Sequence, residues 1–165
     1  MYVFFDTEFT SMAADAHLIS IGMVSERGET FYAESMEFSI EACNGFVKRE
    51  VLPLLDGMRP LMLVQIGFQA GDWLDQFDDV KMLTDASDLD WRFVEQIFAH
   101  VWPENLRRQP GHYFFPQSEP GVYLWEQLEI LRPRFRAHHA LDDAMVHRLA
   151  FHNTQQAFPG WQPEF

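Results

Sequence analysis

The most informative segment of the 165-residue chain is residues 3–10, with the sequence VFFDTEFT. Its apolar beginning is typical of a buried strand, which we place at residues 2–5. Side chains alternate along a strand, so Asp6 and Glu8 project from one face at its end. Neighbouring carboxylates repel each other, and a bound divalent cation relieves that repulsion. The alternative, in which the two acids only mark the solvent end of a strand, stays open at this point.

The strand pattern continues after this segment. Residues 18–25 (LISIGMVS) form a second apolar run, and residues 29–33 (ETFYA) alternate between polar and apolar side chains. Residues 27–29 lie between the two runs and can form a tight turn. We therefore predict that the chain begins with an antiparallel meander of three strands.

The rest of the chain mixes helices with a short strand. Helices are expected at residues 44–55, 60–77, 91–100, 123–131 and 140–156. Asn44 is a candidate N-cap of the first helix, and Pro53 should end it. A strand is expected at residues 80–84 and a long irregular loop at residues 102–121, which contain four prolines. This order indicates an α/β fold, a mixed sheet flanked by helices, in one domain over residues 1–165.

Composition excludes several classes of protein. The net charge of −13 lacks the basic footprint of a general nucleic-acid coat. The lone Cys43 excludes an internal disulfide and a cysteine-based zinc site. No apolar run approaches the roughly 20 residues of a membrane span, and the N-terminal residues lack the basic segment of a signal peptide. We therefore expect a cytoplasmic protein that does not span a membrane.

Bound cations would change the local charge of an acidic cluster from negative to positive. The acidic composition is therefore still compatible with binding of a nucleic acid. Direct contacts to such a partner would then fall to arginines in the second half of the chain: Arg107, Arg108, Arg132, Arg134 and Arg136.

Two further acidic segments precede or begin predicted helices. Residues 88–90 (DLD) suit a helix start, where acids cap the backbone and favour the helix dipole. Residues 138–144 (HHALDDA) suit another start and add a histidine, His138, five residues before Asp143. Both side chains can face one cavity, and a histidine can take a proton from water. His139 and His147 are expected to be surface or core residues rather than ligands.

Together these segments resemble the motifs of the DEDDh exonucleases, which are RNase H-like 3′-to-5′ exonucleases. Residues 5–10 (FDTEFT) resemble the first motif of that family, and residues 138–144 resemble the third. In the second motif the family's asparagine is absent, and alignment on Phe93 selects Asp90 rather than Asp88. Residues 18–24 (LISIGMV) are also similar to a small subgroup, the mycobacterial-type 3′–5′ exoribonucleases.

The resemblance implies an RNase H-like fold and two Mg²⁺ or Mn²⁺ ions per site. Asp6 would bridge both ions, Glu8 and Asp143 would complete one of them, and Asp90 would support the other. His138 would act as the general base that takes a proton from the attacking water.

The resemblance also implies a substrate. Phe9 and the backbone of Thr10 would contact the terminal base and sugar of a single-stranded 3′ end. The product would be a nucleoside 5′-monophosphate, and the subgroup favours RNA. Relatives of this kind are often dimers, and the aromatic residues within 113–125 are compatible with a homodimer.

Three alternatives stay open. The first is a DNA exonuclease of the same fold. The second is a phosphatase of the haloacid-dehalogenase type, which begins with an apolar strand that ends in Asp-X-Asp; Glu8 and the spacing of His138 and Asp143 weigh against it. The third is an RNase H-like module that binds nucleic acid without cleaving it, although all four acids and the histidine are present.

Overall fold

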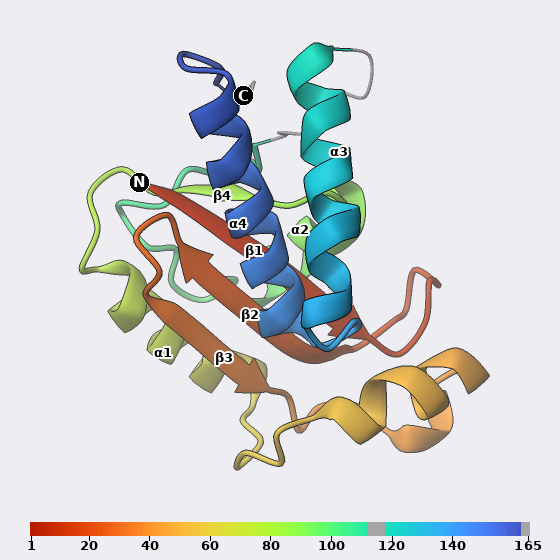
Figure 1. The fold of residues 1–165 in the computed structure, drawn as a ribbon. Helices are drawn as coiled ribbons and strands as arrows, with labels where there is room; N and C mark the ends of the chain where they lie inside the picture. The colour runs from red at the N-terminus through yellow and green to blue at the C-terminus, as the bar shows by residue number, and fades with distance from the viewer. Residues whose placement is uncertain (112–117, 163–165) are drawn as a thin grey trace.

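The computed structural model describes residues 1–111 and 118–162, and its centre is a four-stranded sheet (Figure 1). The strands are β1 (Tyr2–Phe9), β2 (Leu18–Ser25), β3 (Thr30–Glu34) and β4 (Lys81–Leu83), in the order β3-β2-β1-β4. The first three strands are antiparallel, whereas β4 runs parallel to β1. The predicted meander and the mixed sheet are confirmed, and the arrangement is consistent with an RNase H-like fold.

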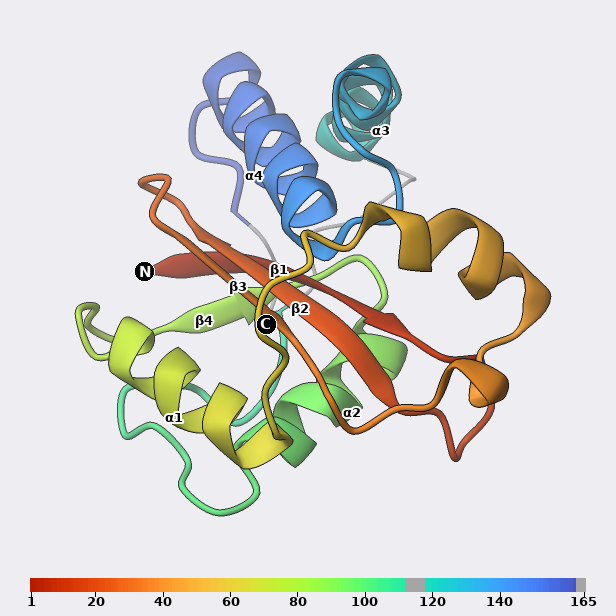
Figure 2. The same ribbon diagram turned by 90° about the horizontal axis from the view of Figure 1, so that it is seen from below.

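Helices cover both faces of the sheet (Figure 2). The helices α3 (Glu119–Leu131) and α4 (Ala140–Ala157) lie side by side on one face, while α1 (Leu63–Leu74) and α2 (Ser87–Ile97) cover the other. Strand β1 is apolar on both sides for this reason. Val3 and Phe5 belong to the core cluster beneath α1 and α2, and Phe4 packs with Leu128 and Phe151 beneath α3 and α4.

A glycine in β2 brings α4 close to the sheet. The β1–β2 register pairs Gly22 with Asp6. A Cβ atom at position 22 would clash with the backbone of Ala140 and Leu141, where α4 begins. Because glycine has no side chain, the first turn of α4 lies directly on β2, next to the middle of β1. The predicted helix at residues 140–156 is confirmed by α4, which extends one residue further.

Several helices begin at other residues than predicted. Helix α1 begins at Leu63 rather than at Pro60, because Leu61 exchanges backbone hydrogen bonds with Glu34 and Met36 at the end of β3. Helix α2 begins at Ser87, so its first turn already includes Asp88 and Asp90.

Helix α3 also begins earlier than expected, at Glu119 rather than at residue 123. The Ser118 hydroxyl accepts a hydrogen bond from the backbone N–H of Gly121, and Pro120 occupies the first turn. Both features favour a helix start. The predicted loop at 102–121 is therefore shorter, and residues 112–117 of it lie outside the described residues. In its described part, Leu106 forms a single parallel bridge with Val80, just before β4, and Gly111 forms one with Leu83 at the end of β4.

The predicted helix at residues 44–55 is irregular. Asn44 does cap it, since its side-chain oxygen accepts a hydrogen bond from the Val47 N–H at 2.9 Å. A π-helix over Val47–Val51 and a 3-10 turn over Leu52–Leu54 follow, and Pro53 lies inside that turn. Two other 3-10 turns occupy Ile40–Ala42 and Arg132–Arg134. Over the described residues, no helix combines the length and the apolarity that crossing a bilayer requires.

Candidate metal centre and active site

Acidic side chains from three distant parts of the chain meet beside β1. Asp6, Asp85 and Asp90 place one carboxylate oxygen each within 4.8 Å of one another. Glu8, His138 and Asp143 form a second group by the same measure, with His138 contributing a ring nitrogen. The four acids and the base predicted from sequence all belong to these two groups: Asp6, Glu8, Asp90, Asp143 and His138.

Asp90 is held by two threonines. Its side chain lies in the first turn of α2 and is only 2% exposed. The hydroxyls of Thr7 and Thr84 each donate a hydrogen bond of 2.6 Å, one to each carboxylate oxygen. Burial raises the pKa of Asp90 to about 6, against the lowering effect of these two hydrogen bonds. Asp88 is exposed, so the structure places Asp90 rather than Asp88 at the cluster.

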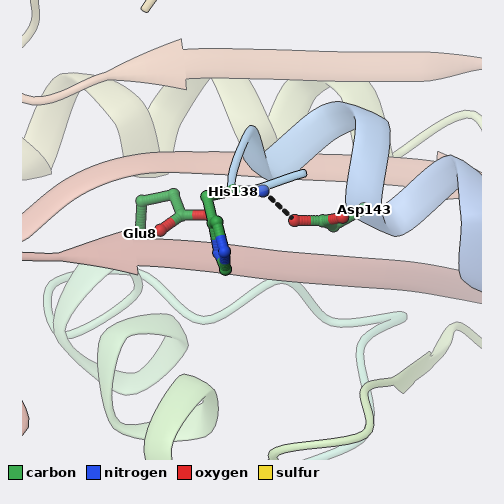
Figure 3. Close-up of side chains that lie close together, drawn as sticks. All are labelled: Glu8, His138 and Asp143. Carbon is green, nitrogen blue, oxygen red and sulfur yellow. Dashed lines mark hydrogen bonds between the residues drawn. The ribbon is translucent and has the colours of Figure 1, made fainter. Parts of the chain in front are cut away.

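His138 lies in the turn that leads into α4 (Figure 3). Its backbone N–H donates a hydrogen bond of 2.9 Å to Oδ2 of Asp143, and its φ of 66° is in the left-handed region. A residue other than glycine is strained there, so the fold must hold this turn in place. The imidazole is exposed beside Glu8, and the ring of Phe46 meets it edge-on at 4.9 Å.

The acids of the cluster hold their protons unusually strongly. Burial raises the pKa of Glu8 to about 8, and the charges of Asp143 and Asp90 add to the effect. Burial also raises the pKa of Asp6 well above its ordinary value, with Asp90 and Glu8 as further causes. Burial raises the pKa of Asp143 too, although the charges of His147 and His138 oppose this. A crowded set of hard oxygen donors with one imidazole fits Mg²⁺ or Mn²⁺.

Two hollows adjoin this cluster and share part of its lining. The first, of about 240 Å³, we call the apolar hollow. Besides acids and a few polar side chains, its lining includes the apolar residues Phe9, Met12, Phe46, Val47 and Val51. The second, of about 400 Å³, we call the polar hollow. It is lined by Asp85, Arg132, Ala137 and His147 in addition to the three residues that both hollows share, Asp6, His138 and Asp143.

The two residues expected to contact a substrate differ in position. Phe9 lines the apolar hollow, and its ring stacks on Phe93 at 5.3 Å. Thr10 is only 1% exposed and lies outside the lining of both hollows. Its backbone carbonyl accepts a hydrogen bond from Asn44, and its backbone N–H donates one to His17. Its hydroxyl accepts another from the His17 N–H.

Two site residues were missed by the sequence analysis, Asp85 and His147. His147 is 4% exposed in α4, and its Nε2 lies 3.5 Å from Oδ2 of Asp85. Burial lowers the pKa of His147, while the charges of Asp85 and Asp143 oppose the shift. His147 was expected to be a surface or core residue rather than a ligand; it lies in the core and also lines the polar hollow. Asp85 carries no periodic signal because it lies in the connection between β4 and α2.

The remaining candidate residues lie away from the hollows or at their edge. His139 is buried, and its ring stacks on Tyr32 at 4.7 Å. Of the arginines considered above, Arg132 lines the polar hollow. Arg107 pairs with an aspartate elsewhere, Arg136 bridges two others, and the remaining two are exposed.

Comparison with known proteins adds an independent observation. No protein-family model matches the chain. Over 55 residues it is 46% identical to curated proteins of two Mycobacterium tuberculosis strains, CDC 1551 / Oshkosh and ATCC 25618 / H37Rv. Each of these is named a 3′-5′ exoribonuclease. This chain is similar to a 3′-5′ exoribonuclease. The match spans 33% of this chain and 33% of each relative's length. The predicted likeness to the mycobacterial-type exoribonucleases is thus confirmed over a third of the chain.

Proposed function

We propose that this protein is a metal-dependent 3′-to-5′ exoribonuclease of the DEDDh type that releases nucleoside 5′-monophosphates from single-stranded RNA. The observation that carries the proposal is the meeting of four predicted carboxylates and His138 between two hollows. The similarity to a 3′-5′ exoribonuclease supports it. A cytoplasmic location, a single-domain organisation and a homodimer belong to the same proposal.

In this function the acids hold two divalent cations, Mg²⁺ or Mn²⁺. Asp6 belongs to the group of Asp85 and Asp90, and the charges of Glu8 and Asp143 in the other group also act on it. Glu8 and Asp143 would hold one ion, and Asp90 would support the other. Asp85 is an additional ligand for the second ion, because its carboxylate lies in the same group as Asp6 and Asp90. Bound ions of this kind lower the pKa of water and stabilise the attacking and leaving oxygens.

His138 is the proposed general base. A ring nitrogen of its imidazole would accept the proton of the attacking water. The hydrogen bond from its backbone to Asp143 fixes the turn, so the ring stays beside the cluster. Because the ring is exposed, it can pass the proton on to solvent.

The terminal base would occupy the apolar hollow. Phe9 is fixed by its stacking on Phe93, and Phe46 is partly exposed at the rim. Stacking of a base on an aromatic side chain contributes about 1–3 kcal/mol whatever the base. Such a site therefore suits removal of nucleotides one after another with little sequence preference.

The test uses 5′-labelled single-stranded RNA and the matching DNA, with Mg²⁺, Mn²⁺ or EDTA. We expect a metal-dependent ladder that shortens from the 3′ end, faster with RNA. Asp90→Asn should abolish the ladder, whereas the matched control Asp88→Asn, in the same helical turn, should keep it. If wild-type protein leaves both strands intact with every metal but hydrolyses p-nitrophenyl phosphate, the phosphatase alternative replaces the proposal.

A further inference from the structure

We propose that the polar hollow binds the nucleotide on the 5′ side of the scissile bond and that Arg132 contacts its phosphate. The inference rests on the proposed function and extends it, because it assigns opposite sides of the substrate to the two hollows.

The first step is the position of the cleavage point. Asp6, His138 and Asp143 line both hollows, so the reacting phosphate must lie between them. A polynucleotide continues on both sides of that phosphate, with one nucleoside on the 3′ side and the rest of the strand on the 5′ side. Each hollow must therefore take one side.

The charges of the substrate and of the hollow linings indicate which side of the scissile phosphate each hollow binds. A 3′-terminal nucleoside ends in a hydroxyl and carries no phosphate beyond the scissile one, so its largest binding surface is the base. The apolar hollow, with Phe9 and Phe46 in its wall, matches that surface. The 5′ side carries a further phosphate at every nucleotide and needs a cation. Arg132 provides one at the polar hollow, and a guanidinium keeps its charge at every accessible pH.

Arg132 can bind a phosphate while it keeps its present contacts. It lies in the 3-10 turn after α3, and its Nη1 pairs with Glu129 at 2.9 Å. Its guanidinium also lies over the ring of Trp125, 5.4 Å from the centroid. The ion pair is exposed and therefore weak. A guanidinium has five N–H donors, so the Glu129 contact leaves capacity for a phosphate oxygen.

The acids in the polar hollow need a compensating charge for this binding. Asp6, Asp85 and Asp143 would repel a phosphate. Divalent cations at the metal centre remove most of that repulsion, and Arg132 adds a positive charge on the side away from the apolar hollow. Binding at this subsite should therefore depend on both the metal and Arg132.

The test compares two substrates that differ on the 5′ side alone. One is a single-stranded RNA oligomer; the other is the p-nitrophenyl ester of a nucleoside 5′-monophosphate, which has no phosphate beyond the scissile one. Arg132→Gln should lower kcat/KM on the oligomer roughly 10-fold or more, mainly through KM, which is the scale of a lost hydrogen bond to a charged group. The ester should be cleaved as fast as by wild type.

The control is Arg59→Gln, an exposed arginine that lines neither hollow, which should leave both substrates unaffected. The salt dependence of oligomer binding should become shallower by about 0.7 in the log–log slope for Arg132→Gln, and Arg132→Lys should restore it. Equal losses on both substrates, or none on the oligomer, would refute the subsite while the exonuclease assignment stands. Wild-type protein that cleaves neither substrate would overturn both.

Discussion

Raising the pH from about 6.5 to about 8 in the presence of EDTA should lower the melting temperature of this protein. Glu8 has a pKa of about 8 in the fold, whereas an ordinary glutamate titrates near 4.5. Between these values the folded chain keeps a proton that the unfolded chain has lost. The folded state binds more protons, so its stability falls as the pH rises. His147, whose pKa is lowered below its usual 6.5, acts in the opposite direction, but only near the lower end of the window, because the histidine of the unfolded chain loses its proton there.

The size of the effect follows from the number of protons retained. One proton changes the free energy of unfolding by about 1.4 kcal/mol per pH unit, or about 2 kcal/mol over this window. Asp90, with a pKa of about 6, is already ionised there. We therefore assign one shared proton to the coupled cluster. In a chain of this size about 2 kcal/mol corresponds to roughly 4–8 °C.

Thermal unfolding followed by circular dichroism measures the effect directly. Glu8→Gln should flatten the pH dependence in EDTA, while the exposed control Asp88→Asn should keep it. Excess Mg²⁺ should raise the melting temperature more at the higher pH, because the ionised acids bind the cation. A melting temperature in EDTA that stays level or rises across the window would refute the assignment of the raised pKa values to this cluster.

Three further predictions concern single substitutions. Asp6→Ala should abolish RNA cleavage, because it removes a carboxylate proposed to hold the metal ions; turnover near wild type would exclude Asp6 as a ligand. His138→Ala should lower kcat about 100-fold, which timed assays with labelled RNA would reveal. Gly22→Ala should cost about 1–3 kcal/mol and reduce the stabilisation by Mg²⁺, because the new methyl group displaces the start of α4; an unchanged urea midpoint would contradict this.

The sheet and the ends of α4 were predictable because their signals are local. Alternation and apolar runs specify β1, β2 and β3, and acids beside a histidine mark the start of α4. The start of α1 was not predictable in this way. Its position depends on the backbone bonds of Leu61 with the end of β3, which are contacts between residues far apart in sequence.

The residues of the candidate metal centre also differ in how far local sequence signals predict their positions. Asp6 and Glu8 share a strand face, so their proximity can be predicted from the period of a strand. Asp85 approaches Asp6 because β4 pairs in parallel with β1, and nothing in the sequence around Asp85 encodes that pairing. His147 is similar: the sequence left open whether it lies at the surface or in the core, and its contact with Asp85 requires α4 to cross the sheet above Gly22.

Because α4 must pack above Gly22, the site of the proposed activity is completed only late in folding. Protein synthesis proceeds from the N-terminus, so the acids of β1 and α2 emerge long before residues 138–143. Until that late segment packs on β2, the site lacks both the proposed general base and Asp143. A site of the proposed activity built in this way would be inactive while the nascent chain is still next to the messenger RNA that encodes it. It would become active once folding is complete.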